Sequence, residues 1–479
     1  MATPFLFCII LCIFGSAATA NATSAAIVLP DTEQPLIPDH PFVAVWNAPT
    51  DQCLQLHIPL DTTAFQAVTT PAKRPGQFLT IFYQHHLGLY PMADTTKHKI
   101  YRGGVPQNGN LTEHLSRAQS QIDQYISQDS SVGLAVIDWE SWRPLWEQNF
   151  GSKHVYQKLS IAHAVWGNPF LSLNQIQRKA KSQFQLSSRR FMEMTIKLAV
   201  SLRPSRRWGF YLFPNCFNYG WKKANYTGKC SAKVKKQNNR LLWLWEQSTA
   251  LFPSIYLHLA LRNSPRAALY VRNRVQEALR VAALPRHPYT APVYVYSRPL
   301  YRDQTNTFQS LTDLVSTVGE SAALGASGVV MWGGSRDYNN KSLSDYLTST
   351  LSPYVANVTA AAMLCSEVLC QGRGRCLRKN YDSSHYLHLN PAHFHILQVD
   401  QKFVAVGQPS AADLNIWAKQ FTCQCYSGSR CSPKLAPPTA IKTIWLTLTC
   451  SLNLDLLRPT WALSWSAEKL QEQEFMTHS

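Results

Sequence analysis

Acidic residues are scarce in this chain of 479 residues, and charge of either sign is sparse. The 28 Asp and Glu residues face 46 Lys and Arg residues, and charged residues make up 15% of the chain against 45% hydrophobic. Disordered chains combine low hydrophobicity with dense charge, so this composition excludes a mostly disordered protein. The formal net charge of +18 predicts an anionic partner, and composition leaves nucleic acid, a membrane surface and an acidic polymer open.

Two conspicuous apolar runs are both short. The first, residues 4–15, has 12 residues, whereas about 20 are needed to cross a bilayer. It precedes Ala18-Thr19-Ala20, a small-x-small pattern that signal peptidase accepts, so residues 1–20 are predicted to be a signal peptide. Secretion makes nucleic acid an unexpected partner. Asn-x-Ser/Thr sequons, the acceptors of N-linked glycans, stand at Asn21, Asn110, Asn225, Asn340 and Asn357.

The second short run, residues 443–454, lies in a divergent tail at residues 433–479. It is free of charge, but its 12 residues are too few to span a bilayer. It also lies too far from the C-terminus for a lipid-anchor signal. Contact of this tail with a membrane surface, or with itself, stays open as an alternative.

Cysteines are clustered rather than spread along the chain. Cys8 and Cys12 leave with the signal peptide, and six of the other ten lie between residues 365 and 431. They follow the order C-x4-C-x5-C, a long insert, then C-x-C-x5-C. In an oxidising compartment this spacing predicts a small disulfide-rich module of epidermal-growth-factor-like (EGF-like) type, at residues 361–432. A zinc site would need closer cysteine pairs in a reducing compartment.

Residues 41–340 alternate short β-branched or aromatic runs with longer stretches of helical spacing. The expected strands are residues 42–46, 79–83, 133–139, 208–213, 293–296 and 328–332. The expected helices include residues 111–127, 186–202, 270–283 and 311–324. Repeated βα units over 300 residues predict an α/β fold, a (β/α) barrel of TIM type, which we assign to residues 21–360. In such barrels the chemistry lies at the C-terminal ends of the strands.

Two carboxylates end the most apolar of these strands. Asp138 and Glu140 follow the run G-L-A-V-I, and residues two apart on a strand face the same side. Ile137 and Trp139 are therefore expected to face the other way. Roughly 6 to 7 Å apart, two such carboxylates repel as ions, which predicts one raised pKa and suits a glycosidase acid.

Glu140 is the better candidate for that acid, since Trp139, Trp142 and Trp146 are expected to surround it. The alternative is that both carboxylates form structural salt bridges, for instance with Arg143. Spacing alone leaves this alternative open.

The sequence around this pair resembles the signature of the animal and venom hyaluronidases. The matching segments, in order, are G-L-A-V-I-D-W-E-S-W-R-P (133–144), W-G-F-Y-L-F-P-N-C (208–216), N-Y-T-G-K-C (225–230), L-F-P-S-I-Y (251–256), G-E-S-A-A-L-G-A-S-G-V-V-M-W-G (319–333) and Y-L-H-L-N-P (386–391). The resemblance covers about residues 41–431 and is greatest to the sperm-type and chondroitin-cleaving branch.

The resemblance implies a glycosidase that cleaves the β-1,4 bond after N-acetylglucosamine in hyaluronan, or in chondroitin. The substrate's N-acetyl carbonyl then acts as the nucleophile, with retention of configuration. Glu140 would be general acid and then base, Asp138 would stabilise the oxazolinium, and Tyr211 would hold the acetamido group. The resemblance implies no metal ion and no cofactor. It predicts a monomer that is secreted, or held in an organelle such as the acrosome or lysosome, with surface attachment open.

Further residues match family positions that line the cleft. Tyr83, Tyr256 and Trp332 would pack on sugar rings, and Arg274 corresponds to an arginine near the site. Without the resemblance, each of these aromatic residues would be interpreted as core.

Basic residues are dense at Arg203 to Arg207, Lys222 to Arg240 and Arg262 to Arg280. Because hyaluronan carries a carboxylate in each disaccharide, these clusters could attract it over a long range. The alternative is that they are solvated faces of helices and loops.

Two departures from the family pattern bear on activity. Asn215 stands where the family usually has Asp in F-P-D-C, and Phe217 stands where Tyr is common. Loss of a nearby negative charge lowers the pKa of an acid carboxyl, which predicts a weaker enzyme or a lower pH optimum. This favours, as a second hypothesis, a hyaluronan-binding or cell-adhesion protein that cleaves poorly, for example in sperm–egg interaction.

The other departure concerns disulfides. The resemblance implies the pairs Cys216–Cys230, Cys365–Cys376, Cys370–Cys423 and Cys425–Cys431. Cys53 matches a family cysteine whose partner position is taken by Asn340 here. Cys53 is therefore expected to be a free thiol or to pair with Cys450.

Overall fold

The computed structural model describes residues 30–435, apart from 50–52, 54, 70–74, 169, 335–336 and 338–340, together with 446–447. The predicted signal peptide, the sequons at Asn21 and Asn340, Cys450 and most of the predicted tail lie outside these residues.

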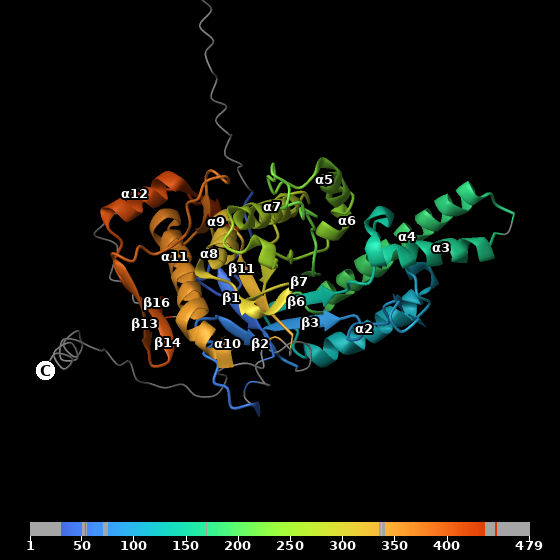
Figure 1. The fold of residues 1–479 in the computed structure, drawn as a ribbon, viewed down its shortest axis with the longest axis horizontal. Helices are drawn as coiled ribbons and strands as arrows, with labels where there is room; N and C mark the ends of the chain where they lie inside the picture. Colours follow the sequence, from blue (N-terminus) through green and yellow to red (C-terminus); the bar gives the residue numbers. More distant parts are fainter. Residues whose placement is uncertain are drawn as a thin grey trace, which may run out of the picture.

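Seven parallel strands form the centre of the molecule (Figure 1). One sheet has, in order, β2 (Ala67–Thr69), β1 (Val43–Asn47), β11 (Gly328–Trp332) and β8 (Tyr294–Ser297). The other has β3 (Leu79–Tyr83), β6 (Gly133–Asp138) and β7 (Arg206–Phe210). All six expected strands are confirmed with small shifts of their ends, whereas β2 was not expected.

An extended segment, residues 251–254, joins the two sheets. Parallel bridges link Leu251 to Val293 and Ser254 to Tyr296 on one side, and Phe252 to Tyr211 on the other. The segment therefore lies between β8 and β7. The resulting order is β2, β1, β11, β8, residues 251–254, β7, β6, β3, in which the first strand of the chain pairs with the last, β11.

The two faces of these strands bury different clusters. Along β6, Leu134 and Val136 belong to an inner cluster together with aromatic residues of the neighbouring strands. Ala135 and Ile137 belong to the larger cluster between strands and helices. Alternation with a period of two residues thus continues to the end of β6, and Trp139 follows Ile137 into the outer cluster, as expected.

Helices surround the strands (Figure 1). They are α2 (Leu111–Tyr125), α3 (His154–Trp166), α4 (Leu173–Leu202), α5 (Ala232–Asn239), α6 (Leu242–Trp245), α7 (Pro265–Ala282), α8 (Leu311–Leu314), α9 (Glu320–Leu324), α10 (Lys341–Tyr346) and α11 (Ser352–Cys370). Wider π-helical turns join α8 to α9 (Val315–Gly319) and α10 to α11 (Leu347–Leu351). The connections contain four single 3-10 turns, η1 (Pro106–Asn108), η2 (Trp146–Gln148), η3 (Gly151–Lys153) and η4 (Leu259–Leu261). They also contain two short antiparallel pairs of strands, β4 (Met92–Asp94) with β5 (Lys99–Tyr101) and β9 (Leu300–Tyr301) with β10 (Gln304–Phe308).

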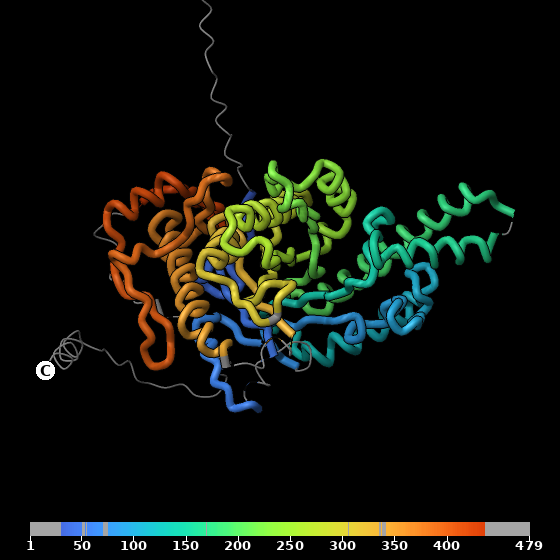
Figure 2. The backbone as a smooth tube through the Cα atoms, viewed as in Figure 1, coloured from blue at the N-terminus to red at the C-terminus, as the bar shows by residue number. Residues whose placement is uncertain are grey.

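α3 and α4 form a helical hairpin that extends away from the strands (Figure 2). A capping box at Ser172 and Gln175 begins α4. Ala164, Ile176 and Ala180 form a small separate core between the two helices near the tip. The hairpin is thus held together by its own packing where it leaves the body.

The C-terminal unit packs against α11, which lies between it and the central strands (Figure 1). It consists of β12 (Gly374–Arg378) paired with β15 (Phe421–Cys425), a sheet of β13 (Phe394–Val399), β14 (Lys402–Gly407) and β16 (Leu446–Thr447), and α12 (Ala411–Gln420). α11 runs through the predicted domain boundary at residue 361 and carries two of the cysteines. The helical stretch Ser342–Cys370 is long and apolar enough to cross a membrane, and 78% of its most apolar window is buried inside the protein.

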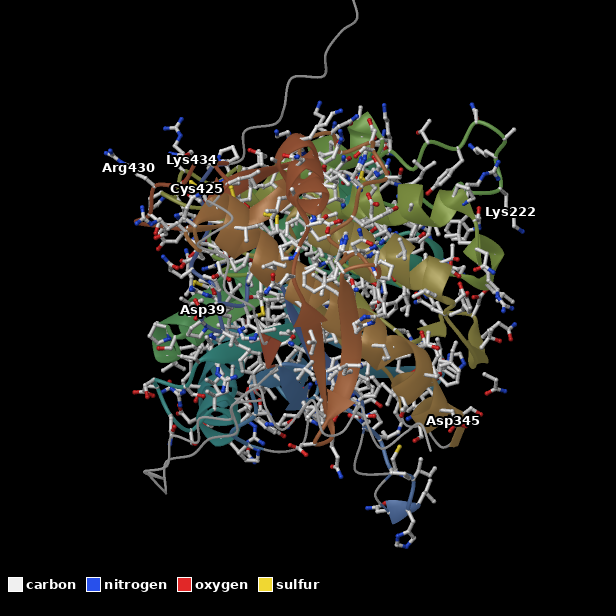
Figure 3. The ribbon with its side chains drawn as sticks, turned by 90° about the vertical axis from the view of Figure 1, so that its left-hand side faces the viewer. Asp39, Lys222, Asp345, Cys425, Arg430 and Lys434 are labelled. Carbon is white, nitrogen blue, oxygen red and sulfur yellow. A yellow bond between two sulfur atoms is a disulfide. The ribbon has the colours of Figure 1, made fainter. Side chains whose placement is uncertain are left out.

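Among the described residues four disulfides are present, and they join the same pairs that the resemblance implies. They are Cys216–Cys230, Cys365–Cys376, Cys370–Cys423 and Cys425–Cys431. Figure 3 shows Cys425, Arg430 and Lys434 near one another at the edge of the C-terminal unit. Cys53 lies between β1 and β2 and is buried, and burial raises the pKa of its thiol.

Candidate active site

A cavity of about 370 Å³ opens at the C-terminal ends of the central strands. Its wall includes residues at or just after the ends of several strands, as expected for an α/β enzyme. Of the residues predicted for the site, it brings together Asp138, Glu140, Tyr211, Asn215, Tyr256, Arg274 and Trp332. Tyr83 joins them through a hydrogen bond that its hydroxyl accepts from Trp332 Nε1 at 3.1 Å.

Asp138 is the last residue of β6 and is partly buried. Its Oδ1 atom is buried and has no hydrogen-bond partner among the described residues. Burial, followed by the charge of Glu140, raises the pKa of Asp138 well above its usual range. Arg143 instead donates from Nη1 to the carbonyl of Gln148 at 3.0 Å, and no ion pair joins it to either carboxylate among these residues. The salt-bridge alternative is therefore wrong for Arg143.

Glu140 is exposed to solvent, which corrects the expectation that tryptophans surround it. Trp139 and Trp142 are buried among the helices, where both stack on Tyr90 with ring centroids 4.7 and 5.0 Å away. The physical reason is the strand alternation, which sends Trp139 to the face opposite the carboxylates. Lys153 Nζ donates a hydrogen bond to the backbone carbonyl of Glu140 and so fixes the segment that carries it.

Aromatic rings form one wall of the cavity. Tyr211 is 9% exposed and packs edge-on against Tyr296 at 4.9 Å, while Tyr256 stacks on Trp332 at 6.2 Å. Burial raises the pKa of Tyr83 to about 12, so its hydroxyl stays neutral at physiological pH. These rings offer flat apolar surfaces beside the two carboxylates.

Arg274 is held rigidly at the cavity wall. Its Nε donates to Asn218 Oδ1 at 2.9 Å, its Nη1 donates to the carbonyl of Ser254 at 2.8 Å, and its guanidinium lies 4.4 Å from the Tyr270 ring centre. Nη2 is buried without a hydrogen-bond partner among the described residues. That leaves a charge-bearing donor available at the site.

Four further cations lie in the same wall, namely Arg143, Lys153, Arg298 and Arg302. Sequence reasoning named Arg143 only as a salt-bridge partner and missed the other three. Arg298 lies 5.8 Å from the Tyr256 ring centre and pairs with Asp337. It directly follows β8, so its place after a strand end could have identified it. Burial, with the nearby charge of Arg143, lowers the pKa of Lys153 to about 8.

Asn215 is nearly buried in the turn after β7. Its Oδ1 accepts the backbone N–H of Phe217 at 2.9 Å, and its own carbonyl accepts from Asn238 Nδ2 at 3.1 Å. The Phe217 ring faces the guanidinium of Arg143, whose Cζ is 5.2 Å from the ring centre. An Asp at position 215 could accept the same N–H, so the Asn removes a charge without removing this turn.

Most ion pairs of the three basic clusters are structural. Arg203 bonds Asp123 at 2.8 Å, Arg207 bonds Glu33 at 3.0 Å, and Arg272 bonds Glu320 at 2.7 Å. Of these clusters, Arg274 lines the cavity. The lysines between residues 222 and 236 are exposed, so long-range attraction of an anionic substrate by this cluster stays a prediction.

The described sequons differ in their surroundings. Asn110 and Asn225 are exposed, and Asn110 caps α2 by accepting the N–H of Glu113. The Asn357 side chain is instead bonded to the backbone of Leu389 through both its oxygen and its nitrogen. Glycan attachment at the sequons stays a prediction.

Paired carboxylates at the end of a buried parallel strand, beside aromatic rings and arginines, define a glycoside hydrolase on an α/β fold. Residues 31–435 match the family described as hyaluronidase. Mouse (Mus musculus) hyaluronidase-5 is 46% identical over 409 residues, which cover 84% of this chain and 77% of that protein. Human (Homo sapiens) hyaluronidase PH-20 is 45% identical over 408 residues, which cover 84% and 80%.

A solved structure of bee venom hyaluronidase in complex with a hyaluronic acid tetramer is also similar. It aligns with 32% sequence identity and a TM-score of 0.59, covering 66% of this chain and 98% of that one. The chain belongs to the hyaluronidase family of glycoside hydrolases.

Proposed function

We propose that the protein is an endo-β-N-acetylhexosaminidase that hydrolyses β-1,4 bonds of hyaluronan with retention of configuration. The observation that carries the proposal is the pair at the end of β6, with Asp138 Oδ1 buried and without a hydrogen-bond partner beside the exposed Glu140. The names of the relatives, and the hyaluronic acid tetramer bound to the bee venom enzyme, support this substrate. Chondroitin is a second substrate to test.

In the first step, Glu140 donates its proton to the glycosidic oxygen as the C1–O bond breaks. The carbonyl oxygen of the substrate's N-acetyl group attacks C1, which forms a cyclic oxazolinium. Asp138 accepts the acetamido N–H and balances the positive charge of this ring, and Tyr211 positions the acetamido group. Water then attacks C1 and gives a proton to Glu140, which restores the acid and the N-acetyl group.

The other cavity residues suit an anionic polysaccharide. Five cations, Arg143, Lys153, Arg274, Arg298 and Arg302, share the wall with the two catalytic carboxylates. They can bind the glucuronate carboxylates on either side of the cleaved bond, and Tyr256 with Trp332 can pack on sugar rings. A salt-sensitive Michaelis constant follows from this arrangement.

The proposal includes a finer account of the fold. The eight extended segments stand in the order of the chain around the sheet, so we propose that β2 and β3 complete a TIM-like barrel. The unit stapled by three disulfides is proposed to be an EGF-like module, attached through α11. The mature protein is proposed to be a secreted or organelle-lumen monomer that needs no metal or cofactor.

The test is release of reducing ends from hyaluronan and chondroitin between about pH 4 and pH 7. Glu140→Gln is expected to lose at least about a thousandfold in kcat with little change in binding, because the general acid is gone. Glu193→Gln, a surface carboxylate on α4, is the matched control and should keep full activity. Hyaluronan binding without turnover in the wild type would overturn the proposal and support the binding-protein hypothesis raised by Asn215.

A further inference from the structure

The tip of the α3–α4 hairpin exposes large apolar side chains. Trp166 is 91% exposed, Phe170 99% and Leu173 77%, and Val165 and Leu171 beside them are also exposed. Single exposed apolar residues are common on protein surfaces, but five at one protruding tip mark an interaction site. The hairpin carries this apolar tip away from the body of the molecule (Figure 1).

Hydrogen bonds fix the two helix ends on either side of the tip. Asn168 Nδ2 donates to the carbonyl of Ala164 at 3.0 Å, and Lys179 bonds the Asn168 side chain from the second helix. Ser172 and Gln175 form the capping box that begins α4. The apolar side chains are therefore held outward by polar groups that already satisfy one another.

The part of the hairpin nearest its tip carries charge of one sign. Residues 148–192 contain no Asp or Glu, but they contain Lys153, Lys158, Arg178, Lys179, Lys181, Arg189 and Arg190. The side chains of Lys158, Arg178 and Lys181 are exposed on the two helices behind the tip. An apolar tip with tryptophan, backed by cations, has the distribution found in proteins that bind the interface of an anionic bilayer.

We propose that the hairpin tip docks the protein on an anionic lipid surface, with Trp166, Phe170 and Leu173 inserted at the level of the headgroups. Behind them Lys158, Arg178 and Lys181 contact lipid phosphates and carboxylates. Leu173, Leu171 and Val165 distinguish this surface from a sugar site, because aliphatic side chains have no flat ring to offer a pyranose. A convex tip also lacks the groove in which a polysaccharide chain would lie.

Docking of the tip would also set the distance between the lipid surface and the cavity. Lys153, which ends η3 just before α3 begins, lies in the cavity wall and bonds Glu140. Ser188, about 15 residues along α4 from the tip, bonds the carbonyl of Pro144 near the site at 3.1 Å. At 1.5 Å per helical residue, the active site would lie on the order of 20 Å above the membrane.

The experiment is sedimentation of the full mature chain with vesicles of phosphatidylcholine, with and without about 30% phosphatidylserine. The wild type is expected to bind the anionic vesicles and to be released at high salt. The variant Trp166→Ser/Phe170→Ser/Leu173→Ser is expected to lose at least about tenfold in partition coefficient. The control is Val132→Ser/Leu311→Ser/Ile416→Ser, which removes three apolar side chains that are about half exposed elsewhere on the surface and should bind as the wild type does.

Hydrolysis of soluble hyaluronan serves as the folding check, because none of these residues lines the cavity. Equal vesicle binding by the tip variant and the wild type would overturn the proposal. It would also be overturned if the wild type did not bind vesicles, if soluble hyaluronan released it from them, or if the tip were needed for a dimer in sedimentation velocity. If the tip variant loses vesicle binding but hydrolyses soluble hyaluronan as the wild type does, the docking proposal is supported, even if the proposed catalytic mechanism is wrong.

Discussion

At the scale of single residues, the environment of Asp138 is unfavourable for a charged carboxylate. A partly buried carboxylate whose Oδ1 has no hydrogen-bond partner among the described residues is poorly solvated, and Glu140 adds repulsion. Nothing in the packing of β6 requires an acid there, because Leu134 and Val136 fill the inner face below it. The cost is explained by the chemistry proposed for the site.

Asp138→Asn is therefore expected to stabilise the protein at neutral pH while abolishing hydrolysis. The folded-state pKa of Asp138 is raised, so the folded protein binds this proton more tightly and loses stability as pH rises from about 3.8 toward that raised value. Because Asn cannot ionise, the free energy of unfolding of the variant at pH 7 should exceed that of the wild type by more than about 1 kcal/mol. Urea unfolding at pH 7 and pH 3.5 measures this; a gain that is equal at both would contradict it.

Asn215→Asp is expected to move the alkaline limb of the pH–rate profile, where the general acid loses its proton, to higher pH by up to about one unit. The new carboxylate lies in the wall of the same cavity and raises the pKa of the neighbouring acids. Asn215→Ala removes the hydrogen bond to Phe217 without adding charge, and so separates the two effects. Identical profiles for Asn215→Asp and the wild type would refute this account of the family departure.

At the scale of elements, the sequence predicts strands well and connections poorly. Periodic apolar runs identified β1, β3, β6, β7, β8 and β11, because each is buried on both faces. Residues 251–254 pair only through isolated bridges, and β2 has three residues, so neither has a run long enough to detect. The same limit applies to the site. Carboxylates at the end of a strand were found, whereas Lys153 ends a single 3-10 turn and Arg302 lies in a turn, and the placement of both depends on tertiary structure.

A buried charge cluster joins three elements that sequence reasoning treated separately. Glu320 of α9 is fully buried and accepts from Arg272 of α7 at 2.7 Å and from Arg378 of β12. Arg378 is itself fully buried. The cluster therefore links the helices of the central fold to the disulfide-rich unit.

Glu320→Gln is expected to lower the free energy of unfolding by about 3–5 kcal/mol, because two buried guanidinium groups lose their shared counter-charge. Chemical denaturation measures the change. The control is Glu193→Gln, which breaks the partly exposed pairs with Arg189 and Lys197 on α4 and should cost less than about 1 kcal/mol. Equal losses of unfolding free energy in the two variants would show that the buried cluster stabilises the protein no more than the partly exposed pairs do.

At the scale of the whole molecule, one buried histidine and one partly buried histidine set a limit on acid stability. Burial lowers the pKa of His114, between α2 and α4, and of His388, against α11, to about 4 in each case. His114 Nδ1 accepts the N–H of Leu89 at 2.8 Å, so protonation there breaks a bond. Both groups bind fewer protons folded than unfolded, so stability is lost as pH falls from about 6.5 to about 4.

His114→Gln is expected to flatten this dependence by up to about 3 kcal/mol across that window, because glutamine keeps an acceptor and cannot be charged. Thermal or urea unfolding at several pH values between 4 and 7 gives the slope. His163→Gln, on the exposed side of α3, is the control and should leave the slope unchanged. A slope that is the same in His114→Gln and the wild type would assign the acid sensitivity to other groups.

The pairing of β1 with β11 also governs how the chain is made. β1 leaves the ribosome roughly 280 residues before its partner, which at about 5–20 residues per second is a delay of roughly 15 to 60 seconds. Throughout that time Val43 to Trp46, all buried in the finished protein, have no strand beside them on that edge. Biosynthesis of this enzyme should therefore depend on chaperones that hold an apolar N-terminal segment until translation is nearly complete.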